Sequence, residues 1–295
     1  MSAIAILGSG PSPTALAWRS FLRDTVSLLS AVIVLAAVAI ALFAPLLMPH
    51  DPADADLLRR LQPPAWMEEG EWAYPLGCDG LGRDLVSRLM AGARVSLGVG
   101  FLVVALSTAI GLAGGGVAGY ARGGTDAVLS RFADVLLGFP YLVFAIGLMG
   151  MMGPGLNNIV ITLVIKEWVV PFRVARGETL GVAELEYVEA ARAVGSSPWR
   201  IMRGEIMPNI LSPVLVVATL RIAQVIIMEA SLSFLGLGVQ PPQTSWGAMV
   251  ADGREFLSDG WWVSTFPGLA ILIVVVAINL AGQGLREAFD PKLRR

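Results

Sequence analysis

Long apolar runs without charges alternate with short polar segments along this chain. A helix that crosses a bilayer needs about 20 apolar residues, and the pattern predicts six such helices. They are expected at Val26–Met48, Val95–Gly119, Arg131–Met152, Leu156–Arg173, Asn209–Leu235 and Trp261–Leu285. We therefore expect an all-α membrane protein, with a long loop over 49–94, a core of five further helices over 95–285 and short tails at 1–25 and 286–295.

The composition agrees with this pattern, since 55% of the residues are hydrophobic and 15% are charged, whereas soluble proteins carry about 25% charged residues. A net charge of −2 and the lack of a basic aromatic patch argue against nucleic-acid binding. One cysteine, Cys78, and one histidine, His50, exclude an intrachain disulfide and a histidine-based metal cluster. Neither lysine follows a Gly-rich loop, so the chain has no P-loop. We expect a non-enzyme that holds no cofactor itself.

The distribution of Lys and Arg predicts how the chain is oriented, because these residues concentrate on the cytoplasmic side of a membrane. With both termini inside, the cytoplasmic segments hold 13 of the 21 basic residues. This orientation places the two tails and the segment 181–208 in the cytoplasm. It places the 49–94 loop outside the cell.

The polar segment Glu184–Pro208 interrupts the apolar pattern and predicts two short helices. Strong helix formers continue up to Gly195, which suits a helix C-terminus. Ser197 and Pro198 suit the start of a second helix, which we expect Pro208 to end. The corner between the helices consists of the small residues Ala190, Ala191 and Gly195. Another protein's surface can approach the backbone closely there.

This segment resembles the EAA loop of permease subunits in bacterial ABC importers, although Met207 stands where that family usually has leucine. The resemblance implies a coupling helix that docks into a groove on an ATPase subunit. The residues implicated in this contact are Glu189, Ala190, Ala191, Gly195, Pro198, Ile206 and Pro208. A helical hairpin without a special partner is the alternative.

The stretch Tyr74–Asp84 combines glycines, which adopt positive φ freely, with aspartates, which bond nearby backbone, and so predicts tight turns. It resembles the LGTD-x-x-GRD signature of peptide and nickel permeases, with Cys78 in place of the usual threonine. The matching residues are Gly77, Asp79, Gly82, Arg83 and Asp84. The turn either meets a binding protein or gates the outer mouth, or else it packs the loop onto the spans.

Ionisable residues inside a predicted span indicate function by default. Arg221 and Glu229 lie eight residues apart and therefore on nearly one helix face. With Ser233 they form the candidate substrate path, in which Glu229 contacts a peptide's amino group and Arg221 its carboxylate. An ion pair with a partner permease that fixes helix packing is the alternative.

Further features predict local packing. Small residues recur every four positions in the second span, at Gly111, Gly115 and Gly119. This face favours close helix packing, with the lining of a conduit as the alternative. Pro140 is expected to kink the third span, where Asp134 is expected near the inner interface, either snorkelling or paired with Arg131. Lys166 and Glu167 are helix neighbours and are not expected to pair with each other.

The segment Glu229–Pro242 resembles the EASLSFLGLG-x-x-PP stretch of C-type permeases, and Glu287–Arg295 resembles their C-terminal ending. The resemblance runs from about residue 20 to the end and implies a C-type permease of the dipeptide/oligopeptide ABC importers, with the type I permease fold, in a bacterial cytoplasmic membrane. It implies a B-type permease partner, two ATPase subunits that bind ATP and Mg, and an external substrate-binding protein. Nickel chelates, glutathione or haem are alternative cargoes. An ATP-independent secondary transporter is the alternative class, although inverted repeats are not evident.

Overall fold

The computed structural model describes residues 20–289, and within this range the regular structure is helical, with one isolated bridge between Cys78 and Asp84. Most of both expected tails, including Asp290–Arg295, lies outside the described residues. The helices are α2 (Thr25–Leu47), α3 (Leu85–Ala121), α4 (Gly123–Gly138), α5 (Tyr141–Met152), α6 (Leu156–Glu167), α7 (Val169–Val182), α8 (Glu186–Ala193), α9 (Pro198–Ile201), α10 (Met207–Phe234), α11 (Trp246–Gly253) and α12 (Trp262–Phe289).

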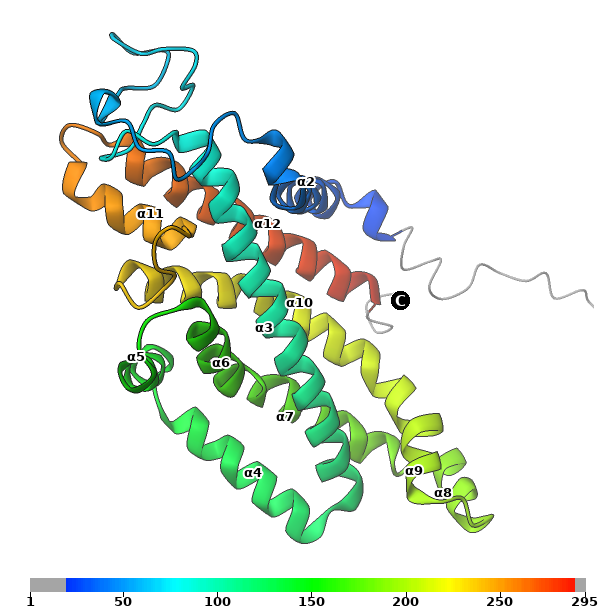
Figure 1. The fold of residues 1–295 in the computed structure, drawn as a ribbon. Helices are drawn as coiled ribbons and strands as arrows, with labels where there is room; N and C mark the ends of the chain where they lie inside the picture. The colour runs from blue at the N-terminus through cyan, green and yellow to red at the C-terminus, as the bar shows by residue number, and fades with distance from the viewer. Residues whose placement is uncertain (1–19, 290–295) are drawn as a thin grey trace, which may run out of the picture.

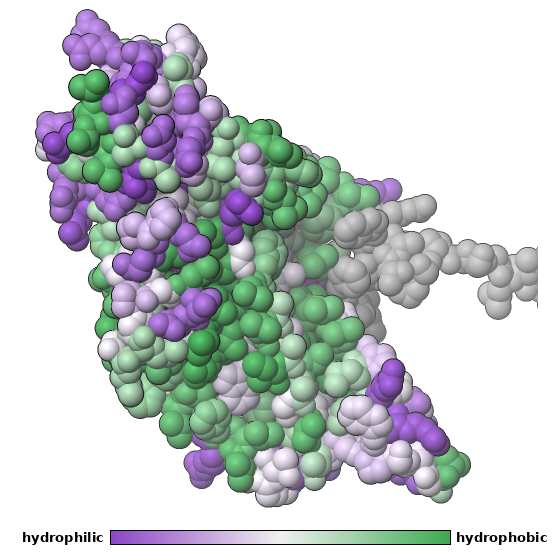
Figure 2. Space-filling model, in the orientation of Figure 1, coloured by the Kyte–Doolittle hydropathy of each residue, from purple (hydrophilic) through white to green (hydrophobic). Residues whose placement is uncertain are grey.

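The segments 49–84 and 184–208 lie at opposite ends of the molecule in Figure 1. One end carries α8 and α9, and we call residues 184–208 the elbow. The other end, the loop end, carries the 49–84 loop and α11. Figure 2 shows polar residues gathered at these two ends and an apolar surface between them. This distribution suits a bilayer around the middle of the molecule.

Four of the described helical stretches are long and apolar enough to cross a membrane: α2, α3, the continuous Pro198–Phe234 and α12. The pair α4 and α5 makes a fifth if it is counted as one span. The fourth predicted span corresponds to α6 and the start of α7, which meet at Trp168. The helical membrane architecture is confirmed, whereas the count of six is matched only in part.

The third predicted span is not one kinked helix, because α4 and α5 meet at an angle of 94°. The break lies at Phe139 and Pro140, where Phe139 has an extended ψ of 132°. Proline lacks an N–H group and drives the preceding residue out of the α conformation. The predicted break position was correct, and its size was underestimated.

Lys166 explains how this break is tolerated inside the fold. Its buried ammonium group donates to the carbonyl of Phe139 at 2.8 Å and to that of Leu136. The last carbonyls of a helix have no intrahelical partner, and a cation at this end also suits the helix dipole. Glu167 contacts a different residue, so the prediction that the two neighbours are not mutual partners is confirmed.

Asp134 was expected either to snorkel or to pair with Arg131, and the structure does not show the pair with Arg131. Its carboxylate accepts a hydrogen bond from Arg173 of α7 at 2.7 Å. The i, i+3 spacing allowed the local pair, but α7 runs beside α4 and offers a second arginine. The ion pair therefore joins two helices instead of stabilising one.

The glycine face of α3 packs against the backbone of α7. A Cβ atom added to Gly111 would lie 2.7 Å from the backbone nitrogen of Phe172, and one added to Gly119 would lie 2.8 Å from the carbonyl oxygen of Arg176. Both distances are shorter than real Cβ contacts. Helix packing is thus confirmed, and these glycines do not line a conduit.

Gly115→Ala is expected to destabilise the chain, because the new methyl group would lie 2.7 Å from Cβ of Ala175 in α7. Overpacking of this kind typically costs about 1–3 kcal/mol. Gly114→Ala is the matched control, since its Cβ would make ordinary contacts of 3.5 Å with Phe172. The thermal midpoint in detergent should fall for the first variant and hold or rise for the second. Equal midpoints would contradict the packing assignment.

Candidate functional site

The elbow turns at a glycine whose backbone conformation requires that residue type. Gly195 has φ +77°, directly after α8. Its N–H donates to the carbonyl of Arg192 at 3.0 Å, and the N–H of Ser196 donates to that of Ala191 at 3.0 Å. This pair of bonds is the Schellman motif that closes helix C-termini. The predicted end of the first helix is therefore confirmed.

The second helix begins at Pro198 as predicted, with Ser197 at the N-cap position but without a capping bond from its side chain. Pro208 does not end this helix, and that prediction is wrong. A π-helical turn over Met202–Ile206 precedes it and shifts the hydrogen bonds, so that the N–H of Met207 donates to the carbonyl of Met202. Pro208 thus falls in the first turn of α10, where its missing N–H is tolerated.

As a consequence, the elbow continues without interruption into a spanning helix. The stretch Pro198–Phe234 is one helical run of 37 residues, which at 1.5 Å per residue measures about 55 Å. It reaches from the elbow to the loop end (Figure 1). The elbow and α10 are therefore one continuous helical stretch, which includes the π turn at Met202–Ile206 and an internal proline at Pro213.

The side chains of the elbow divide into an exposed set and a buried set. Glu189, Ala190, Gly195, Pro198 and Pro208 are exposed. Ala191 is partly buried, and Ile206 is fully buried in a cluster with Val188, Ile201 and Ile210. Ile206 therefore holds the elbow to its support and does not reach its surface.

Two exposed apolar residues were not singled out from the sequence. Val194 is 81% exposed and Trp199 is 72% exposed, one on each side of the corner. They lie on the same exposed elbow as the small-residue corner. The sequence does show two apolar residues within a polar segment. Only the structure shows that both side chains are exposed and not buried.

Arg221, one of the candidate path residues, already has a partner within the chain. Its guanidinium donates two hydrogen bonds to the carboxylate of Glu167 in α6, at 2.8 and 2.9 Å, and a third to Gln224. Glu167 is 1% exposed. The pair joins α10 to α6, so the sequence prediction of an ion pair with another chain had the right interaction and a different partner.

Glu229 and Ser233, the other two path candidates, lie within the fold. Glu229 is fully buried and accepts hydrogen bonds from Ser96 of α3 at 2.9 Å and from Ser233 at 2.7 Å. Ser233 is 4% exposed and reaches the edge of a cavity of about 550 Å³ at the loop end. In this arrangement Glu229 connects α10 to α3 and does not face a cavity.

The loop signature forms a buried ionic network. Asp79 accepts hydrogen bonds from the N–H groups of Leu81 and Arg83, at 2.8 and 3.0 Å, and pairs with the side chains of Arg83 and Arg88. Burial alone raises the pKa of Asp79, but Arg88, Arg83 and the backbone donors together hold it below its ordinary value. Arg88 also pairs with Asp252 at 3.1 Å.

The other signature residues shape the backbone around this network. Asp84 caps α3 by accepting from the N–H of Ser87 at 2.9 Å, while Gly77 and Gly82 have φ +80° and +75°. Burial raises the pKa of the neighbouring Cys78 thiol to about 12, which keeps it protonated. The signature therefore packs the loop onto α3 and α11.

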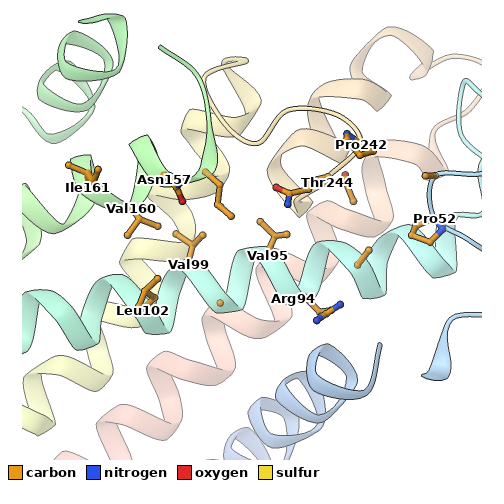
Figure 3. A pocket seen from close by; sticks show the side chains of 15 residues that line it. Pro52, Arg94, Val95, Val99, Leu102, Asn157, Val160, Ile161, Pro242 and Thr244 are labelled. Atoms are coloured by element: carbon orange, nitrogen blue, oxygen red, sulfur yellow. The ribbon is translucent and has the colours of Figure 1, made fainter. Parts of the chain in front are cut away.

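A groove of about 950 Å³ lies between α3, α6 and the segment 242–244 (Figure 3). Its polar lining residues are Arg94, Asn157, Gln243 and Thr244. None of the three path residues predicted from the sequence lines it. The described residues hold no cluster of three or more His, Cys, Asp or Glu side chains that would suit a metal ion.

Comparison with known proteins places these features in a family. Residues 111–295 match the family described as binding-protein-dependent transport system inner membrane component, and residues 12–64 match the N-terminal TM domain of oligopeptide transport permease C. The Di/tripeptide transport system permease protein DppC of Pseudomonas aeruginosa is 40% identical, covering 96% of this chain and 94% of that protein. The dipeptide permease DppC of Escherichia coli is 42% identical, covering 94% and 93%.

The Glutathione transport system permease protein GsiD of Pectobacterium atrosepticum is 41% identical, covering 94% of this chain and 90% of that protein. Among solved structures, an inward-facing form of the MetNI methionine ABC transporter has a TM-score of 0.56 at 18% identity, covering 69% of this chain and 97% of that chain. This likeness supports the fold. The chain belongs to the binding-protein-dependent transport system inner membrane components, the permease subunits of ABC importers.

Proposed function

We propose that this chain is the C-type permease of an ATP-driven importer of di- and oligopeptides, and that it forms half of the translocation path. The single observation that carries the proposal is the exposed, small-residue elbow continuing into the 37-residue helix that reaches the loop end. A surface so built can receive a force from another protein and pass it to the membrane core. Both termini and the elbow then lie in the cytoplasm of a bacterium, in agreement with the distribution of basic residues.

The partners follow from this arrangement. A B-type permease completes the path, two ATPase subunits dock on the two permeases and hydrolyse ATP with Mg, and an external binding protein delivers the cargo. On this chain the ATPase contact comprises the exposed elbow residues, among them Glu189, Ala190, Gly195, Val194 and Trp199. The chain itself contributes no covalent chemistry.

In the proposed cycle, ATP binding draws the ATPase subunits together and displaces the elbow. Because Pro198–Phe234 is one helical run, α10 tilts with the elbow, and the Arg221–Glu167 pair carries α6 along with it. The groove between α3 and α6 then changes its opening from the cytoplasmic to the external side. Hydrolysis returns the elbow to its first position.

The peptide cargo is supported by relatives named as di/tripeptide and dipeptide permeases at 40–42% identity. The groove of about 950 Å³ has the size of sites that hold small ligands, which occupy about 300–1,000 Å³. A relative named for glutathione is 41% identical, so glutathione, itself a small peptide, is the second candidate cargo.

The test is uptake into proteoliposomes that contain both permeases and both ATPases, with the binding protein supplied on the outer side. Labelled trialanine should accumulate only when ATP is enclosed with the ATPase domains, and labelled glutathione is tested in parallel. Uptake by the purified chain alone, without nucleotide, would identify a secondary transporter and overturn the proposal. Uptake of glutathione but not of trialanine would change the cargo.

Glu229→Gln is expected to alter transport and to leave ATPase docking intact. Glutamine has nearly the same shape and keeps one oxygen, which accepts from Ser96 or Ser233, while its NH2 group donates to the hydroxyl of the other serine. The fold is therefore preserved while the carboxylate is removed. We expect at least a severalfold change in ATP-dependent trialanine uptake with an unchanged ratio of ATPase to permease after purification. Unaltered uptake would assign Glu229 to packing alone.

A further inference from the structure

One face of α3 forms the floor of the groove described above. The residues on it follow helical spacing: Ala91, Arg94, Val95, Gly98, Val99 and Leu102. Val160 and Ile161 of α6 continue the apolar wall. Figure 3 shows Arg94 on one side of α3, with Asn157 and Thr244 on the other side of the same helix. The groove therefore combines an apolar wall with a few polar groups at its margin.

Arg94 lacks the acidic partner that most arginines of the membrane core and its borders have, a property it shares with the exposed Arg131 of α4 among the described residues. Arg221 pairs with Glu167, Arg88 with Asp79 and Asp252, and Arg176 with Asp126. Arg94 is exposed and makes no hydrogen bond or ion pair with any residue in the described range 20–289. It is also the one charged side chain among the residues that line the groove.

The position of Arg94 along α3 makes this lack of a partner informative. Arg94 lies ten residues after the capping Asp84, which corresponds to about 15 Å of helix, so it belongs to the half of α3 nearer the loop end. Charged groups within a spanning helix are costly unless they face a partner or a water-filled path. Arg94 stands at the boundary where the apolar run of α3 begins, and its unpaired guanidinium at the rim of the groove is available to an anionic ligand.

We propose that Arg94 binds the C-terminal carboxylate of the peptide cargo as the peptide passes through the groove. Guanidinium groups bind carboxylates in a bidentate manner that fixes orientation. The peptide's side chains lie against Val95, Val99 and Val160, and Asn157 is placed to bond its backbone. This inference rests on the proposed function and names the end of the peptide that the chain recognises.

Arg94 thereby takes the role that the sequence suggested for Arg221. A carboxylate at Arg221 would have to displace Glu167, whose two oxygens already accept hydrogen bonds from that guanidinium. At Arg94 nothing has to be displaced. The lining of the groove contains no carboxylate of its own, so in this chain the peptide's amino end has no matching charge.

The test compares trialanine with trialanine amide in the complete reconstituted transporter, using the wild type, Arg94→Gln and Arg94→Lys. Arg94→Gln should lower the ratio of acid to amide uptake by about tenfold, which corresponds to about 1.4 kcal/mol. Arg94→Lys should retain most of the ratio because it keeps the charge. The binding protein is the same in all assays, so its own selection cancels in the comparison.

Arg254→Gln is the matched control, because Arg254 is also exposed at the loop end, has no acidic partner among the described residues and lies outside the groove. It should leave the ratio of acid to amide uptake unchanged.

An unchanged ratio in Arg94→Gln, including equal losses of acid and amide uptake, would overturn the inference while leaving the proposed function intact. Loss of the B-type permease on purification of Arg94→Gln would assign the arginine to an acid of that partner. No ATP-dependent uptake in the wild type would overturn the proposed function itself.

Discussion

Glu167→Ala is expected to prevent the chain from reaching a stable folded state in the membrane. The substitution leaves the guanidinium of Arg221, which is 20% exposed on its side chain, without the carboxylate that accepts two of its hydrogen bonds. Breaking a buried pair by removing one partner costs about 3–5 kcal/mol, a large part of the stability of a typical protein. We expect a steep loss of monodisperse protein after extraction and a fall of the thermal midpoint in detergent.

Two further variants separate the charge from the packing. Glu167→Met combined with Arg221→Met removes both charges, and we expect it to recover most of the lost stability, because an apolar pair of similar volume replaces a buried ion pair at little cost. Glu178→Ala is the matched control, since Glu178 is exposed on the neighbouring α7 and forms no ion pair in the described structure. A Glu167→Ala chain as stable as the control would show that the pair does not join α10 to α6.

Hydropathy predicted the helical membrane class because burial of apolar surface in a bilayer depends on composition over a window, which a sequence displays directly. It could not predict that α4 and α5 meet at 94°, because a buried Lys166 from another helix satisfies the carbonyls at the break. Pro208 was misjudged for a similar reason. The π turn before it is a property of backbone register that residue types do not reveal.

The motifs located the elbow and the loop signature correctly but did not separate contact residues from supporting ones. Ile206 and Ala191 belong to the same motif as Gly195, yet Ile206 is fully buried and Gly195 is exposed at the corner. Arg94 was missed as a ligand-binding residue, because in the sequence it stands at the boundary of an apolar run. The proposed role of Arg94 depends on two structural observations: its side chain has no partner among the described residues, and it lines the groove.

Gly195→Leu is expected to suppress both transport and the stimulation of ATP hydrolysis by the transported peptide. At φ +77° a leucine is strained, and its side chain protrudes from a corner where nothing lies within 4 Å. The surface proposed to enter the ATPase groove thus gains bulk where it has almost none. The chain should still insert, because the elbow's support, centred on Ile206 and Val188, is untouched. Trialanine uptake and its stimulation of ATP hydrolysis should fall together, by tenfold or more.

Two controls give this result its meaning. Gly195→Asn places a residue that tolerates positive φ at the corner and adds less bulk, so it should keep most of the coupling. A loss equal to that of leucine would show that any side chain at the corner interferes, and not backbone strain. Gly177→Leu adds the same bulk to the exposed surface of α7, again with nothing within 4 Å, and should transport normally. If Gly195→Leu transported as well as Gly177→Leu, the elbow would not be the ATPase contact. A continuous helix of about 55 Å would then lack a source of force at its cytoplasmic end, and the mechanism proposed for α10 would fail with it.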